Sequence, residues 1–275
     1  MAEVAMQNRY VADVGDFGKF GLLRALMGIT DPDHGPCLSL GVVWYRPSKE
    51  EGPSGDGSKR GYLEPSKQPL YEACDPMLFG RLKEISHTNR DLREIEDSDI
   101  LGHEQASFYN VAIDVPERHW SREKREARRS EWFKGALERV GDKEIVFLDP
   151  DNGLAPKSVP IRLKGATKYA YMQEIARLRA IKTKPVIVIY HHLGRSYGGQ
   201  RADHPSQMHL WATKLRDDLN LAEEPEVLWY RRGTARAYFV LLDSGHDRSN
   251  VIRHRLQRFR SGLWFEHEHF TPLPS

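Results

Sequence analysis

The sequence predicts an α/β protein with a mostly parallel sheet covered by helices on both faces and an antiparallel hairpin at the C-terminal edge. Two continuous apolar runs, Ile145–Leu148 and Pro185–Tyr190, have the composition of strands that are buried on both faces. Segments of helical periodicity alternate with these runs, which is the order expected of a parallel sheet. Near the C-terminus, Glu226–Tyr230 and Ala235–Leu242 have the pattern of two strands around a short polar turn, which predicts the hairpin. We expect residues 1–275 to form a single domain.

The composition predicts a soluble, folded protein. The chain of 275 residues carries a formal net charge of +2 and is long enough to bury a sizeable core. It has no apolar run near the roughly 18 residues that a membrane span requires, and its N-terminus lacks the basic and apolar regions of a signal peptide. Two cysteines, Cys37 and Cys74, are too few for a disulfide framework and are typical of buried thiols in a reducing compartment. These features favour a cytoplasmic protein without a membrane partner.

The first expected elements are a glycine-containing turn and a helix. Glycines recur at every third position from Gly15 to Gly21, and Phe17–Met27 has apolar residues at helical spacing. Such glycines allow the backbone to approach either a ligand or a packed element. The patterns GxxxxGK(S/T) and GxGxxG are absent, so this is not a standard phosphate or dinucleotide loop. We interpret the turn as substrate-binding, with a structural helix cap as the alternative; its candidate residues are Asp16, Phe17 and Lys19.

The middle of the chain supplies a strand, an insertion and further helices. Cys37–Tyr45 has the pattern of a strand. Residues 46–67 are rich in Pro, Gly, Ser and charge, which predicts a flexible insertion that is either a binding loop or inert. The other expected elements are a strand at 108–115, a charged helix or loop at 90–98, and helices at 76–85, 117–140, 169–181, 208–219 and 248–260.

Two of these helices, 117–140 and 248–260, are locally basic. Arginine and lysine side chains bind a phosphate backbone by releasing its condensed counterions, so either helix is a candidate nucleic-acid contact. A solvated helix face is the alternative for each. The candidate nucleic-acid-binding residues are Arg125, Arg128, Arg129, Arg253 and Arg255 in these helices and Arg201 in the loop that follows the Pro185–Tyr190 strand.

Polar residues follow the strand Ile145–Leu148 directly. Asp149 and Asp151 place two carboxylates within one turn, and mutual repulsion in a dry site would raise one pKa and allow proton transfer. Asn152 offers both a donor and an acceptor, which suits the edge of a nucleobase. The alternative is a loop in which an aspartate caps the next turn.

The strand Pro185–Tyr190 ends in a second polar cluster. His191 and His192 titrate near neutrality, Tyr190 offers an aromatic surface, and Arg195 adds a fixed cation. Carboxyl ends of parallel strands lie at one edge of a sheet, and open α/β sheets bind ligands there, so we expect the two clusters to face one pocket. We expect no metal site, because adjacent histidines in an extended chain point to opposite faces and no CxxC or HxxxH spacing occurs.

These segments resemble the uracil-DNA glycosylase superfamily. VFLDPDNG is similar to its first motif, and VIYHHLGRSYGG is similar in layout to its second, in which a strand-end histidine opens a loop that penetrates DNA. The resemblance implies that Asp149 or Asp151 positions water and stabilises the sugar cation. It also implies that His191 or His192 stabilises the departing base and that Asn152 reads the base. The two motifs lie closer together here than in that superfamily.

A second resemblance is to the adenine-N6 methyltransferases. Asp149-Pro150-Asp151-Asn152 is similar to their (D/N/S)PP(Y/F/W) motif, and GDFGKFGLLRAL resembles the N-terminal segment of an rRNA adenine methyltransferase family. That fold also has an antiparallel edge. However, Asp151 and Asn152 replace the second proline and the aromatic residue, and no glycine-rich turn for S-adenosylmethionine follows the strand that ends at Tyr45.

We expect the protein to hydrolyse the N-glycosidic bond of a flipped base in DNA without a cofactor. The expected substrates include modified bases. One alternative is an S-adenosylmethionine-dependent nucleic-acid methyltransferase. The other is a nucleic-acid-binding protein without catalytic activity, in which the two basic helices make the contacts.

Overall fold

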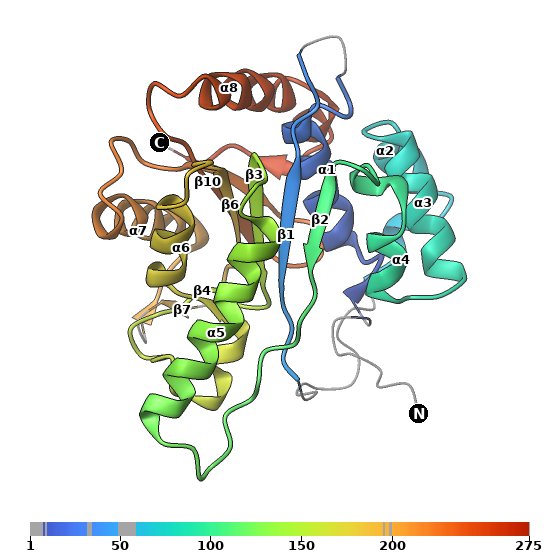
Figure 1. Cartoon of the computed structure of the whole chain (residues 1–275). Coiled ribbons are helices and arrows are strands. Elements are labelled where there is room, and N and C mark those ends of the chain that lie inside the picture. The colour runs from blue at the N-terminus through green and yellow to red at the C-terminus, as the bar shows by residue number, and fades with distance from the viewer. Residues whose placement is uncertain are drawn as a thin grey trace.

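The computed structural model describes residues 8, 10–31, 35–48, 59–194, 196–197 and 200–274. Within these ranges the chain forms a seven-stranded mixed sheet in the order β11-β9-β10-β6-β3-β1-β2, which confirms the predicted α/β class (Figure 1). The strands of this sheet are β1 Leu40–Tyr45, β2 Ala106–Tyr109, β3 Ile145–Pro150, β6 Val186–His192, β9 Glu226–Tyr230, β10 Arg236–Leu241 and β11 Phe270–Thr271. Two small ladders pair β4 Gly153–Leu154 with β5 Tyr169–Ala170, and β7 Ser196–Tyr197 with β8 Gln200–Arg201.

The centre of the sheet is parallel. β1 pairs in parallel with both β2 and β3, and β3 pairs in parallel with β6 from Ile145↔Val186 to Leu148↔Ile189. The expected adjacency of the two apolar runs is therefore confirmed. The predicted hairpin is also confirmed, since β9 and β10 are antiparallel. The hairpin does not end the sheet, however, because β10 pairs with β6 and the short strand β11 covers the outer side of β9.

Helices cover both faces of the sheet (Figure 1). α1, α2, α3, α4, α8 and α9 contribute to the apolar core on one face, and α5, α6 and α7 contribute to the core on the other. We call these the α1 face and the α5 face. The helices are α1 Val14–Met27, α2 Gln68–Glu72, α3 Pro76–His87, α4 Leu92–Glu96, α5 Arg122–Val140, α6 Met172–Arg179, α7 His204–Asp218, α8 Asp247–Arg260 and α9 Leu263–Glu266.

Helix α1 has clear start and stop signals. The side chain of Asp13 accepts hydrogen bonds from the backbone N–H groups of Gly15 and Asp16, which caps the helix, and Gly28 ends it in the left-handed conformation at φ 86°. Within the helix, a Cβ atom at Gly18 would collide with the Tyr230 ring, and one at Gly21 would collide with the Trp264 ring. The glycine spacing therefore serves close packing of α1 against β9 and α9.

Some element boundaries differ from the predicted ones. The strand expected at 108–115 leaves the sheet after Tyr109, and Ile113 pairs only with Pro47, in an isolated bridge. The helix expected at 169–181 begins at Met172, because Tyr169–Ala170 pairs with β4 as a strand. Residues 49–58 of the expected insertion lie outside the described residues. Across the described part of the chain, no helix combines the length and the apolar composition that a membrane crossing needs.

Candidate functional site at the carboxyl edge of the sheet

The carboxylate of Asp149, at the end of β3, lies in a buried ion-pair cluster. Its Oδ2 atom is 3.0 Å from Lys19 Nζ, and the same ammonium is 2.8 Å from Asp16 Oδ1, one helical turn earlier on α1. The side chains of Lys19 and Asp149 are only 12% and 13% exposed. The structure therefore brings together three candidate residues from distant parts of the sequence, and the sheet edge supplies the position of the carboxylate.

The start of α1 is fixed where it meets this cluster. Asp16 Oδ2 accepts a hydrogen bond from the backbone N–H of Ala12, at 2.9 Å. The hydroxyl of Tyr230 donates to the carbonyl of Val14 at 2.6 Å, and that of Tyr62 donates to the carbonyl of Ala12 at 3.3 Å. These bonds hold the turn before α1 from three directions. Asp16 and Lys19 are consequently placed by the fold and are not free to rearrange independently.

Arg236, at the start of β10, adds a second cation to the cluster. Its guanidinium lies 3.8 Å from Asp13 and donates to the carbonyls of Arg232 and Thr234. A Cβ atom at Gly15 would occupy the position of this guanidinium, so the glycine makes room for it. Gly15, in the first turn of α1, thus accommodates a charged side chain of the protein itself.

Burial dominates the electrostatics of the cluster, which we call the Asp149 cluster: Asp13, Asp16, Lys19, Asp149 and Arg236. Burial raises the pKa of both Asp13 and Asp149, while the ammonium of Lys19 opposes this effect at Asp149. The pKa of Lys19 is raised by its two carboxylate partners against the effect of burial, so the lysine stays charged. With all groups ionised, three carboxylates face two cations, which is a formal charge of −1.

Two tyrosines border the Asp149 cluster. Tyr190 of β6 and Tyr238 of β10 are cross-strand partners, with ring centroids 6.0 Å apart. Burial raises the pKa of both phenols. The hydroxyl of Tyr238 is buried, and no described residue pairs with it. A buried hydroxyl without a partner is costly, so this atom is a strained feature of the site.

His191 lies on the α5 face, away from Asp149. Its ring packs 5.1 Å from Trp211 and 6.0 Å from Phe239, and its Nδ1 accepts a hydrogen bond from the backbone N–H of Leu154. Gly153 enables this contact, because its φ of 94° favours glycine and a Cβ atom there would collide with His191. Burial lowers the pKa of His191 to about 3, so the imidazole is neutral. These contacts describe a structural histidine.

The other candidates after β3 and β6 are distributed around the edge. His192 follows His191, pairs in register with Arg236, and is half-buried with a lowered pKa due to burial and nearby cations. Asp151 and Asn152 lie in the half-exposed turn after β3, where the Asn152 backbone donates to the carbonyl of Lys168. Phe17 is fully buried among aromatic rings, so it is not placed to stack on a substrate. Arg195 lies outside the described residues.

The candidate arginines of α5 have different surroundings. Arg129 is buried in an ion pair with Glu174, at 2.6 Å, and is not exposed to a phosphate backbone. Arg125 donates to four backbone carbonyls, those of Glu117, Arg118, Trp120 and Arg162. Only Arg128 of the three extends into solvent, with a side chain 59% exposed. Arg201 belongs to β8, and the described structure does not place its side chain.

Helix α8, which carries the candidates Arg253 and Arg255, lies at the opposite edge of the sheet (Figure 1). Arg255 is 3% exposed and donates to the carbonyls of Leu26 and Pro36, which precede β1. Arg253 is at the surface and pairs with Glu223 at 2.8 Å. Helix α8 therefore spans the amino ends of the strands, and it cannot contact the same ligand as Asp149 in a compact site.

Comparisons with protein-family models, with curated proteins and with solved structures give no significant match for this chain.

One group of side chains has the composition of a metal site. Ligand atoms of Cys74, His267 and His269 all lie within 4.8 Å of one another. Hydrogen bonds account for this arrangement, because both imidazoles contact the carbonyl of Leu70, at 2.8 and 3.0 Å. Arg232 Nε lies 3.3 Å from His269 Nδ1 and can only donate, which leaves the proton on Nε2 and removes the lone pair a metal would need.

Three members of the site were not predicted from the sequence: Asp13, Arg236 and Tyr238. A signal for two of them is present in β10, where Arg236, Tyr238 and Val240 alternate with apolar residues and therefore share one face. An arginine in an otherwise buried strand indicates that a partner for its charge lies at the end of the sheet. Asp13 carries the signal of a helix N-cap, which does not by itself indicate a role in a site.

Proposed function

We propose that this protein is a nucleobase-directed hydrolase that cleaves an N-glycosidic bond in DNA, with its reaction centre at Asp149. The observation that carries the proposal is the Asp149–Lys19 ion pair at the carboxyl end of β3, within a buried cluster of three carboxylates and two cations. Open α/β sheets bind ligands at this edge. The buried Tyr238 hydroxyl, which has no described partner, lies near Arg236 and Asp149 of the same cluster.

The charge of the cluster suits this chemistry. Cleavage of a glycosidic bond develops positive charge on the sugar, as in other glycoside hydrolyses. A fixed carboxylate in a water-poor site stabilises such charge strongly, because its position needs no reorganisation during the reaction. Burial raises the pKa of Asp149, and the ammonium of Lys19 opposes this rise. The reacting nucleotide would have to leave the base stack to reach a buried carboxylate.

In the proposed step, a water molecule adds to the anomeric carbon of the sugar, and its proton passes to Asp149. The base leaves with the electron pair of the carbon–nitrogen bond and takes a proton from solvent. Arg236 provides a fixed positive charge beside Tyr190, and this charge would stabilise the departing base. His191 has no part in this step, because it lies on the α5 face.

A second candidate, methyl transfer to a nucleobase, is favoured by the strand order. β10 is antiparallel and lies between β6 and β9, which is the kind of antiparallel edge that the methyltransferase resemblance implies. S-adenosylmethionine does not fit the described residues after β1, however. Arg46, Pro47 and Ser48 contain no glycine, and Pro47 continues in an extended bridge to Ile113. We therefore derive no step through this cofactor.

The test is mass spectrometry of the products formed from plain, uracil-containing and modified DNAs, with and without S-adenosylmethionine. We expect the wild-type protein to release a free base and leave alkali-labile sites. Asp149→Asn keeps an acceptor for Lys19 but removes the carboxylate, so it should abolish release. Asp142→Asn is the matched control, because its carboxylate is 72% exposed and pairs only with the adjacent Lys143 among the described residues.

Each outcome separates the candidates. Base release that persists in folded Asp149→Asn would overturn the assignment of the reaction centre. A methylated nucleoside, formed only with S-adenosylmethionine, would replace the proposed function with the second candidate. Binding of DNA without either product would indicate a binding protein.

A further inference from the structure

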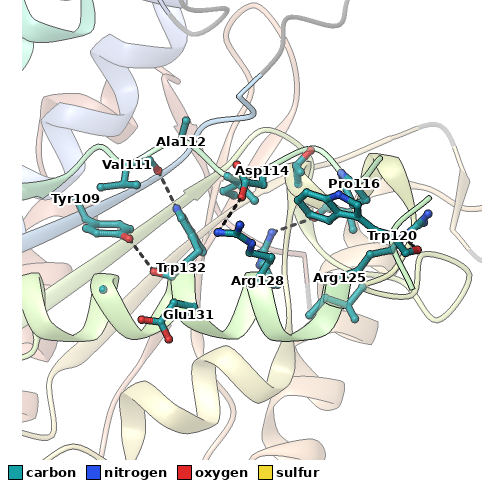
Figure 2. Close-up of a pocket in the computed structure, with 16 residues that line it drawn as sticks. Tyr109, Val111, Ala112, Asp114, Pro116, Trp120, Arg125, Arg128, Glu131 and Trp132 are labelled. Carbon is teal, nitrogen blue, oxygen red and sulfur yellow. Dashed lines mark hydrogen bonds and ion pairs between the residues drawn. The ribbon is translucent and has the colours of Figure 1, made fainter. Parts of the chain in front are cut away.

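A pocket of about 370 Å³ lies between the N-terminal half of α5 and the loop that follows β2 (Figure 2). It opens on the α5 face, whereas the Asp149 cluster lies on the α1 face. Its volume is near the lower end of the range for small-molecule sites. The pocket is therefore separate from the proposed reaction centre and is large enough for one nucleotide.

The floor of the pocket is aromatic and rigid. Tyr109 and Trp132 are 8% and 7% exposed, with ring centroids 5.6 Å apart. The Tyr109 hydroxyl donates to the carbonyl of Trp132, and Trp132 Nε1 donates to the carbonyl of Val111, each at 2.8 Å. Figure 2 shows both bonds. Because their polar atoms are engaged, the two rings are held in fixed orientations in the lining of the pocket.

Arg125 organises one rim of the pocket. Its guanidinium donates at 2.8 Å to the carbonyls of Glu117 and Arg162, and its Nε donates to that of Trp120 at 3.1 Å. These bonds join the segment before α5 to the segment before η5 Lys164–Lys168. Arg125 is therefore a positioning residue that fixes Trp120, and not a direct contact for a polyanion.

Two cations lie beside the indole of Trp120, which lines the pocket. Lys124 Nζ lies 4.8 Å from the Trp120 ring centroid, and the Arg128 guanidinium lies 5.9 Å from it. Arg128 also approaches Asp114, but at 4.0 Å, with both side chains more than half exposed. Such an exposed pair is weak, so a ligand anion can replace the carboxylate. The surroundings of Trp120 thus offer ring surface next to exchangeable positive charge.

We propose that this pocket binds one nucleotide of a nucleic-acid strand, with the base against the aromatic surfaces and the phosphate at Arg128 and Lys124. Base–aromatic stacking next to basic side chains is the arrangement by which proteins bind unpaired strands. An unpaired base is required, because a stacked base cannot enter a pocket. The inference rests on the proposed function only in taking nucleic acid as the substrate, and it places a strand contact on the α5 face.

The test is fluorescence anisotropy with a labelled single-stranded oligonucleotide over a range of salt concentrations, with deoxynucleoside monophosphates in a parallel arm. Trp120→Ala should weaken binding at least about fivefold, and Trp120→Phe should retain most of it. Arg128→Ala should lower the slope of log affinity against log salt by about one. Arg122→Ala is the matched control on the same helix, since Arg122 pairs with Glu126 outside the pocket and should bind like the wild type.

The outcomes are decisive without any measurement of catalysis. Binding of the monophosphates that depends on Trp120 would support the nucleotide site with a free ligand as its occupant. Wild-type affinity in both Trp120→Ala and Arg128→Ala would overturn the proposal. Equal weakening by Arg122→Ala would overturn it as well, because general charge would then explain the binding. If the pocket is confirmed in this way and the protein releases no base, the result would support this inference and overturn the proposed function.

Discussion

The ammonium of Lys19 lies 3.0 Å from Asp149 Oδ2, although 130 residues separate the two in the sequence. This contact joins the first turns of α1 to the carboxyl end of β3. Asp16 contacts the same ammonium, so one lysine neutralises parts of two carboxylates in a buried site. The contact is thus a structural requirement of the fold as well as the centre of the proposed reaction.

The first prediction concerns stability. Lys19→Met should destabilise the protein by about 3 kcal/mol, because it leaves two buried carboxylates without their shared cation. Urea unfolding at neutral pH measures the effect. Lys214→Met is the control: Lys214 pairs with Asp218 at the surface, one turn away on α7, and its loss should cost at most about 0.5 kcal/mol. Equal costs for the two variants would show that Lys19 is not buried against its partners.

The second prediction compares two helical glycines. Gly21→Ala places a methyl group against the Trp264 ring, which should cost about 1–3 kcal/mol through overpacking. Gly80→Ala, on the exposed side of α3, meets no atom within 4 Å and should stabilise the protein by up to about 1 kcal/mol. Thermal unfolding of both variants tests the pair. Stabilisation by Gly21→Ala would mean that α1 and α9 do not pack as described.

The sheet was predictable because its signals are local. Apolar runs at β3 and β6 end in polar residues, and the parallel order brings these ends to one edge, as observed. The sequence could also have predicted which strand side chains lie on each face of the sheet. Alternate residues of a strand point to opposite faces, so His191 and His192 could not both face Asp149. The prediction that His191 and Asp149 face one pocket was therefore wrong.

The roles of the arginines were not predictable in the same way. Arg129 lies in the same basic helix as Arg128, and Arg255 lies in the other basic helix. The partners of Arg129 and Arg255 nevertheless come from distant parts of the chain. A sequence does not show that Glu174 will lie beside Arg129, or that the carbonyls of Leu26 and Pro36 will lie beside Arg255. Burial of a charged side chain depends on these long-range partners.

The third prediction concerns pH. The pKa of His191 is about 3 in the folded protein, against an ordinary value of 6.5, so between these pH values only the unfolded chain takes up the proton. Stability therefore falls as pH decreases below about 6.5, at up to about 1.4 kcal/mol per pH unit. His191→Asn replaces the Nδ1 acceptor for Leu154 with an amide oxygen that does not titrate. Urea unfolding between pH 4.5 and 6.5 should show a slope smaller by about that amount, whereas an unchanged slope would contradict the burial of His191.

The last prediction separates two arginines of α8 that the sequence did not distinguish. Arg255 donates to the carbonyl of Leu26 at 2.8 Å, in the last turn of α1, and to that of Pro36 at 2.7 Å. Arg255→Met removes both charged hydrogen bonds, and we expect a loss of about 3 kcal/mol in unfolding free energy. Arg253→Met breaks only a surface pair with Glu223 and should change stability by less than about 1 kcal/mol. Both side chains lie at the amino edge of the sheet. We therefore expect each variant, when folded, to bind DNA as tightly as the wild type in an anisotropy measurement. Weaker binding by Arg253→Met would instead place a nucleic-acid contact on α8, remote from Asp149.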